Sequence, residues 1–357
     1  MATNQAGDIG VLKSMWRQNP DGKWVIHDIK SIDLKPREGF SNDYFRVKDE
    51  LVLLTQRPGP VMDSLFSSFG MTEFLLRQSV VPVIAWNEGE DEIRCIGTGF
   101  FISASGLLLT AGHVLRDPVD EKYSSVTKIE NGQHKLSDDL NFGILLPTNP
   151  AMRTAPFVKL DQAVRDAQWI MCPFEWALHW GKDYESPLIH EKPEFKLQLD
   201  IAVCKVRQHP IIGAYQPLNI GPHSLAVGNR AVALGYPEMR NIRMTGGDYY
   251  QPELFVSVGS VTEIYPDNIT EKQNPTPGPN FEFNATIPGK MSGGPIVVGE
   301  GILTKGVISR SMGSRDSHAS GCLIAPMLPL PLINGKSIID LQRDGTEGIG
   351  QFMGRGL

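Results

Sequence analysis

One short segment constrains this chain more than any other: a serine sits in a glycine-rich turn that leads into an apolar stretch. Residues 289–295 read Gly-Lys-Met-Ser-Gly-Gly-Pro, and the stretch Ile-Val-Val follows. A serine hydroxyl is a weak nucleophile at neutral pH, so a protein that uses one exposes it on a tight turn next to a base. Glycines permit such a turn, and nearby backbone N–H groups can face a developing oxyanion. The same pattern is also typical of an ordinary turn before a strand, so its interpretation depends on a base and an acid elsewhere in the chain.

A histidine and an aspartate occupy suitable positions. His113, in Thr-Ala-Gly-His-Val, follows the strand-like run at 97–102 and a turn at 103–106, which places it where a strand ends. Asp200 enters the apolar run Ile-Ala-Val. Each residue alone has an ordinary structural explanation, as a structural histidine and as an edge-strand aspartate. With Ser292, however, they follow the order histidine, aspartate, serine, which is the order of the chymotrypsin triad.

The motifs between about residues 80 and 330 resemble, in family order, those of the trypsin-like (chymotrypsin-fold) serine peptidases. Within that superfamily they are most similar to the bacterial HtrA/DegP-like branch. The resemblance implies an all-β dominated fold, with two six-stranded antiparallel β-barrels and the active site in the cleft between them; we expect an N-terminal α/β extension in addition. The matching segments are GTGFFIS, LLLTAGHV, LDIAVCKV, VGNRAVALGYP, VSVGSVTEI, KMSGGPIVV and GVISRS.

The resemblance also implies roles for individual residues. His113 is expected to act as the general base, Asp200 to orient its ring, and Ser292 to attack the substrate. The backbone N–H groups of Lys290 and Ser292 are expected to form the oxyanion hole. Thr286, six residues before the nucleophile, corresponds to the base of the pocket for the P1 side chain, and because it carries no charge we expect uncharged P1 residues to be preferred over Lys or Arg. The substrate-binding residues implied are Thr286, Ser309, Arg310 and Ser311.

Lys290 is where the sequence departs from the family. Active relatives usually have glycine two positions before the serine, whereas here Gly289 stands one position earlier. A Cβ atom restricts the backbone angles available to a residue. Two interpretations follow: Lys290 turns its N–H away from the oxyanion and leaves the resting enzyme latent, or Gly289 absorbs the strain and Lys290 serves normally.

The chain divides into three parts at this level. Residues 1–79 form an N-terminal extension that is either a structural brace or a docking module, with short strands expected at 24–29 and 50–54 and one or two helices at 62–78. Residues 80–330 form the peptidase domain, in which 80–209 is the first barrel and 210–330 the second. Residues 331–357 form a C-terminal tail that is too short for the PDZ domain found in HtrA proteins.

Residues 147–194 are interpreted as an ordered insertion in the first barrel. Three of the six tryptophans, Trp169, Trp176 and Trp180, lie there, which is more than a disordered loop would hold. Part of it, residues 164–178, has a partly helical pattern. The insertion either forms a rim over the active site or packs on the first barrel.

Composition excludes several classes of protein. With 34 Lys and Arg against 40 Asp and Glu, the net charge of −6 does not favour nucleic acid as a partner. The sequence holds no apolar run long enough to cross a membrane and no signal-peptide pattern near residue 1, so a cytoplasmic location is expected. The histidines and cysteines show no metal-ligand spacing, so no metal and no cofactor are expected, and the four cysteines are interpreted as buried free thiols.

These observations favour a serine endopeptidase that acts on a protein or peptide substrate. The alternative is a catalytically degenerate trypsin-like protein that works as a binding or scaffold module. A third hypothesis is an enzyme held latent until an activating protein partner docks on 1–79 or 147–194. The sequence does not indicate an oligomeric state.

Overall fold

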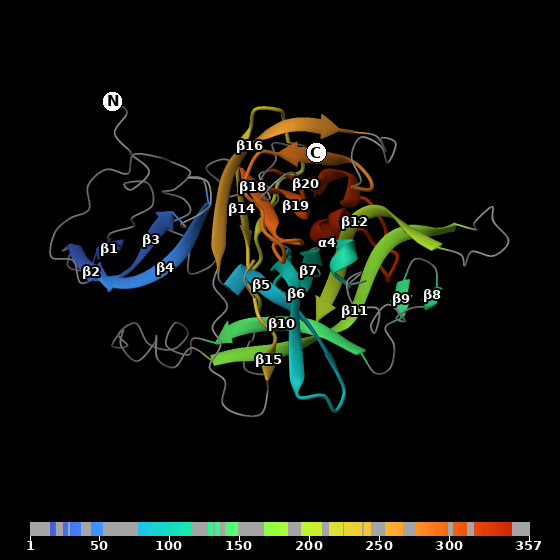
Figure 1. The fold of residues 1–357 in the computed structure, drawn as a ribbon, viewed down its shortest axis with the longest axis horizontal. Coiled ribbons are helices and arrows are strands. Elements are labelled where there is room, and N and C mark those ends of the chain that lie inside the picture. The colour runs from blue at the N-terminus through green and yellow to red at the C-terminus, as the bar shows by residue number, and fades with distance from the viewer. Residues whose placement is uncertain are drawn as a thin grey trace.

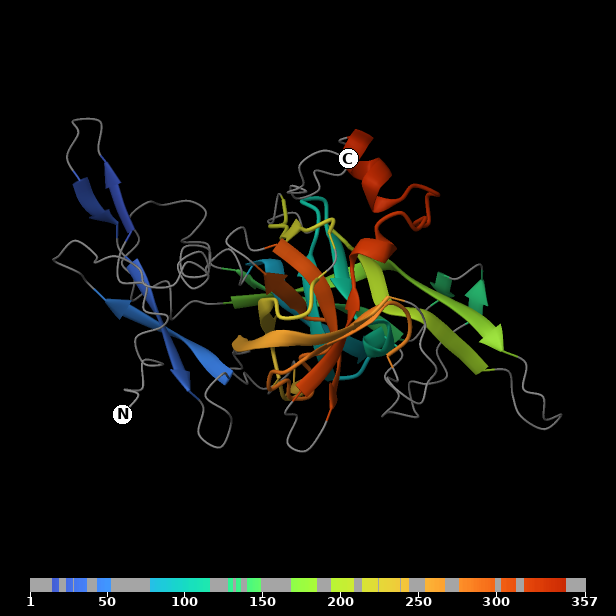
Figure 2. The same cartoon turned by 90° about the horizontal axis from the view of Figure 1, so that it is seen from above.

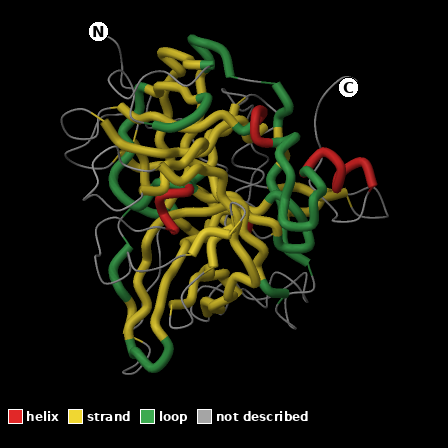
Figure 3. The backbone as a smooth tube through the Cα atoms, turned by 90° about the vertical axis from the view of Figure 1, so that its right-hand side faces the viewer, coloured by secondary structure: helices red, strands yellow, loops and turns green. Residues whose placement is uncertain are grey.

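The protein is built from two closed β-barrels, seen in a computed structural model (Figure 1). Figure 3 shows that strands dominate the chain and that helices are short. In the described part of the chain, no helix is long and apolar enough to cross a membrane. The structure describes residues 15–18, 24–27, 29–36, 44–52, 78–115, 128–130, 133–135, 140–148, 168–184, 194–208, 214–223, 225–237, 239–243, 254–266, 276–298, 303–312 and 318–344.

The first barrel has six antiparallel strands. They run in the order β10-β5-β6-β7-β12-β11, and pairing between β10 and β11 closes the barrel. The side chains of β5 and β7 are almost all buried, which explains why these strands read as continuous apolar runs rather than alternating ones. The strands are β5 (Val80–Asn87), β6 (Glu92–Phe101), β7 (Leu107–Thr110), β10 (Leu140–Thr148), β11 (Gln168–Tyr184) and β12 (Glu194–Val206).

Strand β11 corrects the prediction of an insertion at 147–194. Residues 168–173 pair with β10 and residues 174–184 pair with β12, so this segment is the sixth strand of the barrel. The partly helical pattern at 164–178 is also wrong from residue 168 onward. Register shifts between Phe174 and Trp176 and between His179 and Gly181 interrupt the strand alternation and hide it in the sequence. Residues 149–167 and 185–193 of the proposed insertion lie outside the described residues.

The second barrel repeats this plan. Its strands run in the order β14-β18-β19-β20-β17-β16, and pairing between β14 and β16 closes it. The two barrels confirm the fold class expected from the sequence. The strands are β14 (Arg230–Gly235), β16 (Phe255–Tyr265), β17 (Asn280–Phe283), β18 (Pro295–Val298), β19 (Leu303–Met312) and β20 (His318–Leu323), and the short β13 (Asn219–Ile220) pairs in parallel with β19.

Part of the N-terminal extension joins the sheet of the second barrel. Strand β4 (Tyr44–Val52) pairs with β16, and β3 (Ile29–Pro36) pairs with β4, as the blue strands beside β16 in Figure 1 show. Strands β1 (Met15–Gln18) and β2 (Trp24–His27) form a separate hairpin. The predicted strand at 24–29 coincides largely with β2, and that at 50–54 overlaps the end of β4. The helices predicted at 62–78 fall on residues that, up to 77, lie outside the described ones.

Smaller elements complete the described chain. After the second barrel, η4 (Ala325–Met327) and α4 (Ile338–Asp344) follow, and Figure 2 shows α4 near the C-terminus. Buried Leu332, Ile338 and Leu341 of the C-terminal segment belong to the same hydrophobic cluster as the first-barrel core. The remaining elements are η2 (Gly112–Leu115), the hairpin of β8 (Lys128–Glu130) with β9 (Gln133–Lys135), and β15 (Ile242–Arg243).

Candidate active site

The structure places His113 directly against Asp200. His113 lies in the 3₁₀ turn η2, three residues after β7 ends, and Asp200 lies within β12, which pairs with β7. The Nδ1 atom of His113 is 2.8 Å from Oδ2 of Asp200, and the backbone N–H of His113 donates to Oδ1 at 2.8 Å. Asp200 is 1% exposed, whereas the His113 side chain is 25% exposed. The buried acid thus fixes the position of a histidine that is still accessible.

Ser309 is the second partner of the buried carboxylate. Its hydroxyl donates to Oδ2 of Asp200, and Ser309 itself is fully buried in β19. Burial alone raises the pKa of Asp200, but the nearby His113 ring and the hydrogen bonds from His113 and Ser309 outweigh it, so the net pKa lies well below its usual range. Asp200 is therefore ionised at neutral pH. The sequence assigned Ser309 to substrate binding alone and missed this contact.

Ser292 lies in the turn before β18, at the junction of the two barrels. Its hydroxyl donates to the backbone carbonyl of Ser309 at 2.8 Å, and its own carbonyl accepts from the N–H of Thr98 in β6 at 2.9 Å. Among the described residues, no hydrogen bond joins the Ser292 hydroxyl to the His113 ring. The structure therefore connects the three residues through Ser309, which contacts both Ser292 and Asp200.

The two glycines after Ser292 are required by close packing. Gly293 has φ +87°, and a Cβ atom there would lie 2.0 Å from the carbonyl oxygen of Thr98. A Cβ at Gly294 would lie 2.0 Å from the carbonyl oxygen of Leu234. Contacts this short exclude any side chain. Both glycines thus allow the serine turn to pack against strands of both barrels.

Lys290 has an unusual backbone conformation for a residue with a side chain. Its φ is +71°, and it is the one non-glycine residue with positive φ in the described chain, whereas Gly289 is not in that region. The interpretation that Gly289 absorbs the strain is therefore wrong, because Lys290 itself takes the left-handed angle. In the described part of the structure, the N–H groups of Lys290 and Ser292 have no protein acceptor. Both N–H groups are therefore available to a ligand, as the donors of an oxyanion hole must be.

Of the other residues predicted for the site, Thr286 lies shortly before this turn in the sequence, and Arg310 and Ser311 lie on β19. Thr286 is 4% exposed and precedes the turn. Arg310 and Ser311 are exposed, and they pair on one side with Ser320 and Ala319 of β20. No described strand pairs with the opposite edge of β19 at these two residues. That edge can accept an extended peptide as an added strand.

Comparison with known families identifies the family of the chain. The family described as trypsin-like peptidase domain matches residues 97–303, which is more than half of the 357 residues. The chain belongs to the trypsin-like peptidase family. This confirms the resemblance found in the sequence. No curated protein sequence matches the chain.

Solved structures similar to this trypsin-like peptidase chain include three with 14 to 16% identity. Deg5 has a TM-score of 0.42 at 16% identity, with 76% of this chain and 95% of Deg5 covered. The protease Anisep from Arthrobacter nicotinovorans has a TM-score of 0.39 at 15% identity, with 69% and 90% covered. The MamO protease domain from Magnetospirillum magneticum, in its apo form, has a TM-score of 0.40 at 14% identity, with 70% and 94% covered.

The cysteines do not contribute a second reactive site. Cys95, Cys172, Cys204 and Cys322 are all buried and free, as the sequence predicted. Burial raises the pKa of Cys95 to about 12 and that of Cys172 to about 11, so both thiols are protonated and unreactive at neutral pH. Within the described ranges, no group of three His, Cys, Asp or Glu residues is arranged to hold a metal ion.

Proposed function

We propose that this protein is a serine endopeptidase in which Ser292, His113 and Asp200 form the catalytic triad. One observation carries the proposal: Ser309 hydrogen-bonds to Asp200 through its hydroxyl and to Ser292 through its carbonyl, while Asp200 holds Nδ1 of His113. Residues from both barrels therefore converge on one buried carboxylate. This convergence supports a triad more strongly than the order of the three residues in the sequence.

The first chemical step is attack on the substrate carbonyl. The Ser292 hydroxyl turns from the Ser309 carbonyl toward His113, whose Nε2 takes its proton as Oγ bonds to the carbonyl carbon. Asp200 stays ionised and stabilises the charged imidazole through Nδ1. The negative charge that develops on the substrate oxygen is stabilised by the N–H groups of Lys290 and Ser292.

The second step breaks the peptide bond and then regenerates the enzyme. His113 returns the proton to the leaving amine as the C–N bond breaks, which leaves an ester between Ser292 and the acyl part of the substrate. Water then attacks this ester, His113 removes its proton, and Ser292 recovers it as the acid product leaves. The open edge of β19 at Arg310 and Ser311 supports an extended polypeptide as the substrate.

One observation favours the alternative of a binding module. The Ser292 hydroxyl is bonded to a backbone carbonyl and not to His113. A trypsin-like protein that has lost catalysis would hold its serine in this way permanently, and a latent enzyme would hold it so until a partner docks on 1–79 or 147–194. The proposal differs from both because it requires the isolated protein to react.

Labelling with a fluorophosphonate tests the proposal most directly. We expect covalent labelling of the purified wild-type protein, and loss of the label in both Ser292→Ala and His113→Ala. Ser105→Ala is a matched control, because Ser105 lies in a turn of the first barrel and bonds to Ser103. Labelling that persists in Ser292→Ala, or a wild-type protein that is folded but never labelled, would exclude the proposed function for the isolated chain.

A further inference from the structure

The turn that carries Ser292 contains a conformation that its own sequence disfavours. Lys290 has φ +71°, where a Cβ atom crowds the following carbonyl oxygen. A glycine would adopt this angle freely, but a lysine leaves it unless neighbouring contacts hold it there. The contacts around Lys290 must therefore hold the left-handed backbone angle that a glycine would adopt freely.

Two hydrogen bonds hold Lys290, one at each end of the residue. Its side-chain Nζ donates to the backbone carbonyl of Met239, a buried residue. Its own carbonyl accepts from the hydroxyl of Thr98 at 2.9 Å. Oγ1 of Thr98 also accepts from the N–H of Tyr236 at 3.0 Å, so the threonine is itself fixed. The side chain and the backbone of Lys290 are thus both anchored outside the turn.

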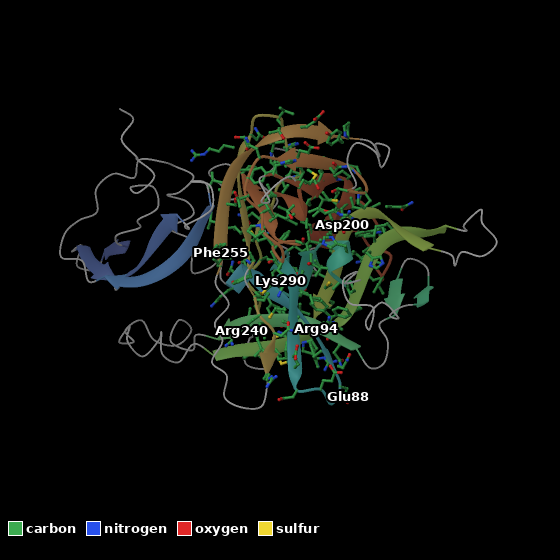
Figure 4. The ribbon with its side chains drawn as sticks, viewed as in Figure 1. Glu88, Arg94, Asp200, Arg240, Phe255 and Lys290 are labelled. Carbon is green, nitrogen blue, oxygen red and sulfur yellow. The ribbon has the colours of Figure 1, made fainter. Side chains whose placement is uncertain are left out.

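Met239 belongs to a segment that crosses from the second barrel to the first. The segment leaves β14, and its strand β15 pairs with β6 through Ile242 with Ile93 and Arg243 with Glu92. The amide of Asn241 also donates to the carboxylate of Glu92. Figure 1 shows β15 beside strands of the first barrel, and Figure 4 labels Lys290 in the central region of the molecule. The acceptor of the Lys290 ammonium is therefore anchored to the first barrel.

We propose that Lys290 is a positioning residue whose side chain, tethered to the Met239 carbonyl, keeps the oxyanion turn in its left-handed form. This inference rests on the proposed function, because the turn matters for catalysis only if Ser292 is the nucleophile. This hydrogen bond takes the place of the conformational freedom that a glycine would have at position 290. It also makes the oxyanion hole depend on how β15 docks on β6.

Two substitutions at Lys290 separate the tether from the backbone preference. Lys290→Met removes the ammonium but keeps a Cβ atom, so the turn can relax and lose an oxyanion donor, a loss that costs about 10²- to 10³-fold when complete. We expect kcat on an unstructured peptide to fall at least about tenfold, with KM within about twofold. Lys290→Gly also removes the tether, but glycine accepts the left-handed angle, so its kcat should exceed that of Lys290→Met at least about fivefold.

Two further variants test the origin of the effect. Asn241→Ala loosens β15 without touching the turn, and it should lower kcat in the same way but less than Lys290→Met does. Lys336→Met is the matched control, because Lys336 is exposed and pairs with Asp344 in the C-terminal segment; its kinetics should equal those of the wild type. All rates are measured well below the melting temperature of each variant.

The contrary results are equally specific. Wild-type kcat in Lys290→Met, equal losses in Lys290→Met and Lys290→Gly, or a rise in KM at constant kcat would each overturn the proposal. Crystal structures of both variants keep this test independent of catalysis: residue 290 should leave the left-handed region in Lys290→Met and stay in it in Lys290→Gly. If the wild type is not labelled by a fluorophosphonate, the proposed function fails, and these structures still decide whether the tether holds the turn.

Discussion

His113 and Asp200 lie on the first barrel in a completed hydrogen-bond network, whereas Ser292 lies in a turn of the second barrel with its hydroxyl bonded to a backbone carbonyl. The acid–base half of the proposed triad is fixed by burial: Asp200 is 1% exposed and its carboxylate is bonded by His113 and Ser309. The nucleophile half is fixed by contacts from other segments, namely Thr98 on the Ser292 carbonyl and Met239 on the Lys290 side chain.

This difference between the two halves indicates how each should respond to substitution. In a buried hydrogen-bond network around a charged group, removing one partner leaves the other polar groups unsatisfied, so the stability of the whole network is lost. Gly289, Lys290 and Ser292 of the serine turn are exposed or half-buried, so this part of the turn can shift at a lower energetic cost. We therefore expect substitutions in the acid–base half to affect both catalysis and stability, and substitutions in the nucleophile half to affect mainly catalysis.

Ser292→Ala should give the largest loss of activity and should separate catalysis from stability most clearly. Without the nucleophile, kcat for peptide cleavage should fall by about 10⁴-fold or more. Ser292 is half-buried in a turn and loses one hydrogen bond, so the free energy of unfolding should change by no more than about 1 kcal/mol. Peptide cleavage and urea unfolding measure the two quantities. Undiminished cleavage would remove Ser292 from the triad.

Asp200→Asn should affect both quantities, as expected for the acid–base half. We expect kcat to fall about 10³- to 10⁴-fold and the free energy of unfolding at pH 7 to fall by about 2 kcal/mol, because charge-assisted hydrogen bonds are lost. Lost kcat without any lost stability would contradict the comparison.

The pH dependence of this stability difference has a definite sign. The folded-state pKa of Asp200 is lowered, so its contribution is complete above its unfolded pKa of about 3.9 and disappears as the pH falls through the folded value. The gap between the wild type and Asp200→Asn should therefore be constant from about pH 5 upward and narrow below about pH 4. Urea unfolding at pH 7, 5 and 3.5 checks this, and a gap that is the same at all three would show that Asp200 is not the titrating group.

A substrate library should show a smaller, selective effect at the P1 position. Thr286 is buried and uncharged, so a P1 cation would be desolvated without a carboxylate partner. We expect uncharged P1 residues to be preferred over Lys and Arg by about a hundredfold in kcat/KM. In Thr286→Asp, the relative rate for P1 Arg should rise. A wild-type profile dominated by P1 Arg would place the pocket base elsewhere.

Local patterns were sufficient to predict that His113 and Asp200 lie together. The histidine, aspartate and serine segments each keep a short motif intact, and the structure brings His113 and Asp200 to 2.8 Å. Contacts between distant segments were beyond the sequence: Ser309 and Asp200 are 109 positions apart, and nothing in either segment indicates the other. Strand β11 was missed because its bulges interrupt the alternation that identifies a strand.

The backbone conformation of Lys290 shows a second limit of prediction from sequence. The sequence identified position 290 as unusual but not which residue takes the strained angle, because that choice depends on anchors at Thr98 and Met239 that come from other segments. Likewise, β4 pairs with an open edge of β16, and no local pattern in the N-terminal extension indicates that this edge exists.

Ser309→Ala tests the comparison at the residue that both halves share. The substitution removes the hydroxyl that donates to Asp200 but keeps the backbone carbonyl that accepts from Ser292. Loss of one hydrogen bond to the carboxylate should lower kcat about tenfold with little change in KM. Ser320→Ala is the matched control, because Ser320 is also a buried serine of the second barrel but bonds to Thr276. If both variants lose stability and only Ser309→Ala loses kcat, the hydroxyl acts through Asp200. Equal kcat losses in the two variants would instead mean that the barrel packing, and not the bond to the acid, controls the rate.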